Sequence, residues 1–166
     1  MENRQLSSLV RVLQIISAAM IMGIVGFAIV TLLIVNWDKI NTELLPLGLI
    51  ALVTPLTSVA AAFVLPGIVL KQSAAQYAKA NPKSELHSLM RASGQAATAS
   101  SVVSLALAEG GALVALVIWM ISGNLLGLLG AFLGLAMLLI KFPTYGKVEQ
   151  RFADFRDEVK LQQRSS

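Results

Sequence analysis

Residues 97–121 read "ATASSVVSLALAEGGALVALVIWMI" and carry one charged side chain, that of Glu109. A run of about 20 apolar residues is long enough to cross the hydrocarbon core of a bilayer as a helix. Three further apolar stretches occupy about residues 12–35, 44–70 and 125–141. The chain is 56% hydrophobic and 13% charged, whereas about a quarter of the residues of a soluble domain are charged. The sequence therefore predicts an all-α integral membrane protein, with a four-helix transmembrane bundle over residues 1–142.

The basic residues indicate an orientation, because the cytoplasmic loops of membrane proteins carry an excess of Lys and Arg. All thirteen basic residues except Lys39 lie before the first apolar stretch, in the segment 71–96, or at and after the end of the fourth stretch. We therefore expect both termini and a loop at 71–96 to be cytoplasmic, in a multi-pass protein of the bacterial inner membrane. Trp37 and Trp119 lie near the opposite boundary, where indole rings prefer the membrane interface.

Residues 143–166 are expected to form a cytoplasmic amphipathic tail. One apolar stripe at helical spacing is formed by Val148, Phe152, Phe155 and Val159. Acidic and basic residues balance on the other faces, whereas a surface helix that selects anionic lipid is usually net basic. We expect the stripe to pack on the cytoplasmic loop, on a neighbouring subunit or on the membrane interface.

Prolines and hydroxyl residues cluster in the second apolar stretch. Pro55 and Pro66 have no backbone N–H, and each leaves a helix carbonyl without its usual donor. The nearby Thr54, Thr57 and Ser58 have hydroxyl groups of the kind that bind such freed groups in membrane helices. Two interpretations follow, a bent helix that serves packing alone, or a hinge or polar cavity formed by these residues around Pro55.

Several function classes are disfavoured by residue types that are missing or isolated. The chain has no cysteine and one histidine, His87, so thiolate or multi-histidine metal sites are excluded. No nucleophile–base pair and no phosphate-binding glycine loop is visible. We therefore expect no enzymatic activity, no cofactor and no metal. The basic residues follow membrane topology rather than a folded basic module, which gives no reason to expect a nucleic-acid partner.

Glu109 is the acidic residue that needs an explanation. A charged carboxylate at the centre of a bilayer costs about 2.5–3.5 kcal/mol on insertion scales, and a hydrocarbon environment favours the neutral form. No basic residue lies in the interior of the four stretches to pair with it. Glu109 is then either a neutral acid that hydrogen-bonds a backbone carbonyl or a threonine, or a site that exchanges a proton or cation. Gly110 and Gly111 follow it directly and leave room for another backbone.

The segment 104–121, "SLALAEGGALVALVIWMI", resembles the carboxylate-bearing helix of the rotary ATPase c subunit, the proteolipid of ATP synthases and vacuolar-type ATPases. That family forms a two-helix hairpin with a polar cytoplasmic loop and an ion-binding Asp or Glu midway along its second helix. The resemblance implies a hairpin over residues 46–121, a loop at "AKANPK", and Glu109 as the ion-binding carboxylate of an oligomer. The family's loop carries Arg-Gln-Pro, where this chain has Ala-Asn-Pro at 80–82.

Three functions remain open on the sequence. The first is a non-catalytic scaffold or accessory subunit of a membrane complex, in which Glu109 is a neutral packing acid. The second is a c-subunit-like proton- or ion-binding protein that uses Glu109. The third is a transporter subunit for a small solute or lipid, with a cavity beside Pro55. In each case the expected partners are the lipid bilayer and either further copies of the chain or the other subunits of a larger complex.

Overall fold

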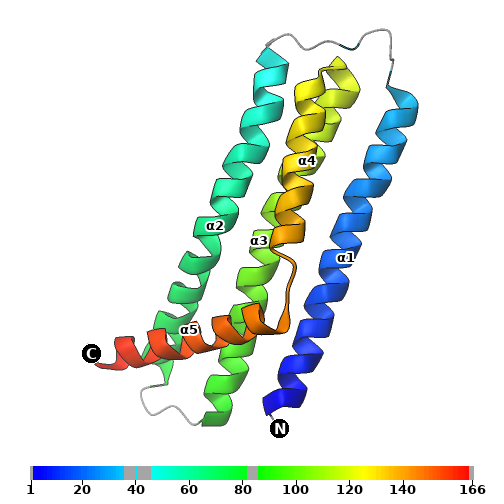
Figure 1. The fold of residues 1–166 in the computed structure, drawn as a ribbon. Coiled ribbons are helices and arrows are strands. Elements are labelled where there is room, and N and C mark those ends of the chain that lie inside the picture. The colour runs from blue at the N-terminus through cyan, green and yellow to red at the C-terminus, as the bar shows by residue number, and fades with distance from the viewer. Residues whose placement is uncertain (1, 36–39, 41–45, 82–85, 165–166) are drawn as a thin grey trace. The chain divides into compact units, whose positions relative to one another are not determined.

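The computed structural model describes residues 2–35, 40, 46–81 and 86–164. Over these residues the chain is helical without strands, which confirms the all-α prediction. The elements in chain order (Figure 1) are α1 (Glu2–Ile34), α2 (Pro46–Ala80), α3 (Leu86–Ser122), α4 (Leu125–Ile140) and α5 (Tyr145–Arg164). Trp37 lies outside the described residues.

Three of the helices are long and apolar enough to cross a membrane. They are α1 over Leu6–Ile34, the whole of α2, and α3 over Ser88–Ser122. Helices α4 and α5 pass the same test only as a pair bent by 76°. The 16 residues of α4, at a rise of 1.5 Å each, make a helix of about 24 Å, shorter than a hydrocarbon core of about 30 Å. The structure therefore supports three or four membrane-spanning helices.

The first three helices extend beyond the apolar stretches from which they were predicted. Helix α1 begins at Glu2 rather than near residue 12, and α3 begins at Leu86 rather than near residue 97. Helix α2 continues to Ala80, so much of the expected loop 71–96 is helical. These polar segments are rich in Ala, Gln, Lys and Leu, which are good helix formers in water as well as in lipid.

The chain divides into two compact units. The α5 unit comprises residues 1–15, 64–103 and 143–166, and the α4 unit comprises residues 16–63 and 104–142. Helices α1, α2 and α3 contribute residues to both units, whereas α4 and α5 each belong to one.

Glycines set the packing of the α4 unit. A Cβ built on Gly134 of α4 would lie 2.6 Å from the Cβ of Ala112 in α3, and one on Gly127 would lie 2.7 Å from the Ala115 carbonyl oxygen. Side chains of any size are therefore excluded at these positions. Small residues that let helix backbones approach closely are how helices associate in lipid.

A tight turn joins α3 to α4 within this unit. Gly123 has a φ of 64°, in the left-handed region where glycine is favoured at a helix end. Asn124 caps α4, because its side-chain oxygen accepts the backbone N–H of Leu126 at 3.0 Å. Gly48 of α2 makes room for this cap, since a Cβ there would lie 2.7 Å from Asn124 Nδ2.

Helix α5 packs its apolar stripe on the protein's own α1, α2 and α3. Phe155 and Val159 lie in one buried cluster with Leu70, Ala74 and Ala96, and Val148 lies in another with Leu6, Val10 and Leu13. The sequence left three surfaces open for this stripe. One of them, the segment 71–96, contributes Ala74 and Ala96 to the contact with α5.

Three polar contacts hold α5 and the residues just before it against the other helices. Gln14 Nε2 donates to the Pro143 carbonyl oxygen at 3.2 Å, and Gln163 Nε2 donates to the Asn81 carbonyl oxygen at 3.2 Å. Between them, the Arg151 guanidinium donates to Ser101 Oγ of α3. Burial lowers the pKa of Arg151 below its ordinary value, while the nearby Asp154 carboxylate acts in the opposite direction.

Candidate functional site: Glu109 and the small-residue face of helix α1

Glu109 lies on the side of α3 that meets α1 within the α4 unit. Its Oε1 is 3.7 Å from the position that a Cβ would take on Gly23 of α1. The side chain is half-buried. No hydrogen bond or ion pair connects it with another residue in the described part of the chain. The carboxyl group is therefore at the rim of the packed core, against a glycine of the neighbouring helix.

The helical repeat explains this position. Leu105 and Ala112, one turn before and after Glu109, are buried in the core of the α4 unit. Ala106, three residues before Glu109 on the adjoining side of α3, is exposed. At about 100° per residue, Glu109 falls between the buried and the exposed sides of α3. Its side chain can thus reach the surface of the unit.

Beside Glu109, α1 exposes a face of small residues, which we call the α1 small face. It consists of Ala19, Gly23 and Gly26, all exposed and spaced by four and three residues, so that they share one side of the helix. A surface of this kind allows another helix to approach closely. The carboxyl group of Glu109 adds one polar group to an otherwise apolar surface.

The residues around Pro55 are close-packed. Pro55 is fully buried, and α2 runs through it without a break. A Cβ on Gly111 of α3 would lie 3.1 Å from Pro55 Cα and 2.8 Å from Ser58 Cβ, and one on Gly130 of α4 would lie 2.8 Å from Pro55 Cγ. These contacts favour the packing interpretation over the cavity. Since Gly111 faces α2, this cluster and Glu109 lie on different sides of α3.

Neighbouring helices cover the two carbonyls that the prolines leave free. Pro66 has no N–H for the Ala62 carbonyl, and Ser104 Oγ of α3 donates to that oxygen at 3.0 Å. Pro55 likewise frees the Ala51 carbonyl, which faces Gly130 of α4 so closely that any Cβ there would overlap it.

The hydroxyl groups near Pro55 do not bind the carbonyls that the prolines leave free. Thr57 Oγ1 donates to the Val53 and Thr54 carbonyl oxygens of its own turn, at 3.0 and 2.9 Å. Ser104, which donates to the Ala62 carbonyl, is 42 residues away from Ala62 in the chain. No local pattern in the sequence links these two residues.

The Trp119 side chain packs inside the protein rather than on its outer surface, and its position near the membrane boundary stays a prediction. The side chain is 0% exposed and belongs to the core of the α4 unit. Gly127 of α4 makes the space for it, since a Cβ there would lie 2.7 Å from Trp119 Cβ. The indole N–H has no hydrogen-bond partner among the described residues.

Comparisons of the chain with protein-family models, with curated proteins and with solved structures found no match. The resemblance of residues 104–121 to the c-subunit helix therefore stays a prediction. In the described residues, no group of three or more His, Asp or Glu side chains lies close enough to hold a metal ion. Function has to be argued from the geometry around Glu109.

Proposed function

We propose that this chain is a small multi-pass membrane protein that acts as a non-catalytic scaffold or accessory subunit and self-associates through the α1 small face and Glu109. The observation that carries the proposal is the half-buried carboxyl group beside the exposed Gly23. The one-sided distribution of basic residues supports cytoplasmic termini.

The chemistry of a neutral carboxyl group favours a second copy as the partner. The protonated group offers one O–H donor and retains acceptor capacity. In a bilayer, where no water is at hand, an unsatisfied polar group costs several kcal/mol. A twofold interface brings the same patch of both copies together, so two Glu109 side chains can each donate to the other. Gly23 and its small neighbours let the backbones come close enough for this pairing.

A second candidate is the c-subunit-like proton or ion binder. It is favoured by the same half-exposure of Glu109, which leaves a route for a proton or cation to the carboxyl group. An intramembrane acid is a functional candidate on general grounds. The two candidates differ in whether Glu109 has to release a proton.

Glu109→Gln and Glu109→Leu separate the two candidates. Glutamine keeps the size, the donor and the acceptor but cannot release a proton, whereas leucine keeps only the bulk. Self-association is measured by energy transfer between labelled copies in vesicles over a range of protein-to-lipid ratios, and proton flux is measured in the same vesicles. An intramembrane hydrogen bond contributes about 0.6–1.7 kcal/mol, so Glu109→Leu should weaken dimerisation by about 3- to 17-fold for each bond lost.

For a scaffold, Glu109→Gln associates as the wild type does, Glu109→Leu associates more weakly, and the wild type conducts no protons. For a proton carrier, the wild type conducts protons and Glu109→Gln does not. Wild-type association by Glu109→Leu, with no proton flux in any variant, contradicts both candidates.

A further inference from the structure

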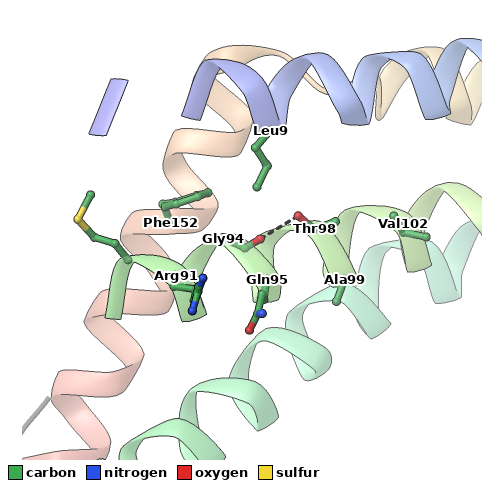
Figure 2. A pocket seen from close by; sticks show the side chains of 9 residues that line it. Leu9, Arg91, Gly94, Gln95, Thr98, Ala99, Val102 and Phe152 are labelled. Atoms are coloured by element: carbon green, nitrogen blue, oxygen red, sulfur yellow. Dashed lines mark hydrogen bonds between the residues drawn. The ribbon is translucent and has the colours of Figure 1, made fainter. Parts of the chain in front are cut away.

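A pocket of about 600 Å³ lies within the α5 unit, between α1, α3 and α5 (Figure 2). Leu9 of α1 and Phe152 of α5 form its apolar side, and α3 contributes two adjacent rows of side chains. Pockets of about 300–1,000 Å³ that are mostly apolar, with a few polar groups, are typical of ligand sites. This pocket is separate from Glu109, which belongs to the α4 unit.

The polarity of the pocket changes along α3. Arg91 and Gln95, both exposed, lie at one end, and Val102 lies at the other. Eleven residues at 1.5 Å each separate Arg91 from Val102 by about 16 Å along the helix. Thr98 Oγ1 lies between them and donates to the Gly94 carbonyl oxygen at 2.8 Å (Figure 2), so its hydroxyl hydrogen is already used. Arg91 is also the last charged residue before the apolar part of α3 begins.

We infer that this pocket binds one anionic phospholipid, with its phosphate at Arg91 and Gln95 and an acyl chain along Leu9, Val102 and Phe152. A guanidinium group binds phosphate through paired charge-assisted hydrogen bonds, and the Gln95 amide supplies further N–H donors. Basic pockets beside membrane-spanning helices bind anionic lipid head groups. The lining residues include one cation and no acidic side chain, so the charge is complementary to an anion.

The apolar half of the pocket selects a lipid over a free anion. A phosphate ion or a soluble phosphate ester uses Arg91 and leaves Leu9, Val102 and Phe152 without contact. A zwitterionic lipid brings its own cation to the head group and gains less from Arg91. A bound anionic lipid touches three helices at once, so it stabilises the folded α5 unit by mass action.

Gly94 provides a way to fill the pocket. A Cβ there would lie 3.5 Å from Phe152 Cζ and 3.6 Å from Leu9 Cδ1, which is ordinary contact. Gly94→Ala therefore fits, while Gly94→Leu occupies the space that the acyl chain needs. Ala99, an exposed lining residue, offers a second filling variant, Ala99→Leu, which adds bulk without entering the packed core.

The test is lipid retention by native mass spectrometry of the full chain in neutral detergent, together with its melting temperature. The probes are phosphatidylglycerol, phosphatidylcholine and the soluble glycerol 3-phosphate. We expect one phosphatidylglycerol per chain, retained over phosphatidylcholine, and a rise in melting temperature with phosphatidylglycerol alone. Arg91→Gln should weaken retention about tenfold or more, and Gly94→Leu and Ala99→Leu should abolish it.

Matched controls are Gly94→Ala, which leaves the space open, and Arg164→Gln, which removes an exposed arginine outside the pocket. Both should retain phosphatidylglycerol as the wild type does. Equal retention of the two lipids, insensitive to Ala99→Leu, indicates a non-specific lipid shell and overturns the inference. Binding of glycerol 3-phosphate as tight as that of the lipid indicates a free-anion site and overturns it as well.

Discussion

The α4 unit and the α5 unit are built on the same three long helices, yet they are held together in different ways. In the α4 unit, backbones approach where side chains are missing, at Gly111, Gly127, Gly130 and Gly134. In the α5 unit, bulky residues such as Phe155 fill the core, and side-chain hydrogen bonds hold α5 and the segment just before it. Among lipid tails, burial of apolar side chains gives little driving force, so helices associate through close packing of their surfaces. In water, an amphipathic helix is stabilised when its apolar stripe is buried.

The distribution of charge agrees with this difference. All the basic residues except Lys39 and Lys141 belong to the α5 unit. Lys141 also contacts an aromatic ring. Its Nζ lies 3.8 Å from the centre of the Phe63 ring, within the range of a cation–π contact. The α4 unit is therefore the part suited to lipid, and the α5 unit is the part suited to the polar boundary.

The largest expected effect concerns fit in the α4 unit. Gly111→Leu forces a side chain against Ser58 and the backbone of Pro55 and should destabilise the protein by about 3 kcal/mol, at the upper end of the range for overpacking. Gly110→Leu is the matched control, because it is the adjacent residue and a Cβ there meets nothing within 4 Å. Unfolding in mixed micelles, followed by circular dichroism, should separate the two variants. Equal stabilities would show that close approach does not hold the α4 unit.

The next effect concerns the hydrogen bond between Arg151 and Ser101 in the α5 unit. Arg151→Met removes the hydrogen bond to Ser101, and hydrogen bonds to charged groups contribute about 1.5–3 kcal/mol. Amide exchange should speed up in α5 while α4 keeps its protection. Arg164→Met, in the exposed last turn of α5, is the control and should change little. Unchanged exchange in α5 after Arg151→Met would mean that the apolar stripe alone holds the helix.

The burial of Arg151 also predicts a pH effect. Burial lowers the pKa of Arg151, but arginine stays protonated over any practical pH range. In Arg151→Lys the same burial acts on a group with an ordinary pKa of about 10.4, so the unfolded chain binds the proton more tightly than the folded one. Stability of this variant should then rise as the pH increases from the lowered pKa to the ordinary one, by at most about 1.4 kcal/mol for each pH interval of one. The measurement is the melting temperature of Arg151→Lys and of the wild type between about pH 8 and the ordinary lysine pKa. If the melting temperature of Arg151→Lys rises with pH no more than that of the wild type, the cation at this position is not buried.

The smallest effect concerns a polar bond inside the α4 unit. Ser104→Ala leaves the Ala62 carbonyl without its donor and should cost about 0.6 kcal/mol, the average for an intramembrane hydrogen bond. In a Pro66→Ala background the backbone N–H of residue 66 can bind that carbonyl, so the cost should shrink. A double-mutant cycle measures the coupling. Additive effects would show that Ser104 does not compensate for Pro66.

The helices could be predicted from the sequence because their signals are local. An apolar run indicates a membrane-crossing segment, and the spacing from Val148 to Val159 predicts the stripe of α5. The sequence could not show which helix faces meet, because this depends on fit between distant segments. The burial of Trp119 against Gly127, and the bond from Ser104 to Ala62, are of this kind.

The same limit applies to the candidate sites. Glu109 could be placed midway along an apolar helix from the sequence alone, but only the structure brings its carboxyl group to Gly23 of α1. The pocket of the α5 unit combines residues from three separate segments. No sequence pattern predicts it, since Arg91 is one of several basic residues whose positions follow topology.

The central claim is self-association through the α1 small face, and single-cysteine cross-linking tests it most directly. The chain has no cysteine, so Ala19→Cys and Ala18→Cys each introduce the only thiol. The two alanines are adjacent and exposed, but they point about 100° apart, and only Ala19 shares a face with Gly23. A disulfide forms only when the Cα atoms approach within about 7 Å. With an oxidant in native membranes, the account predicts a linked dimer for Ala19→Cys, little for Ala18→Cys, and a reduced yield of the dimer when Glu109→Leu is added. Equal cross-linking at both positions, or a dimer at Ala19→Cys that survives Glu109→Leu undiminished, would contradict it.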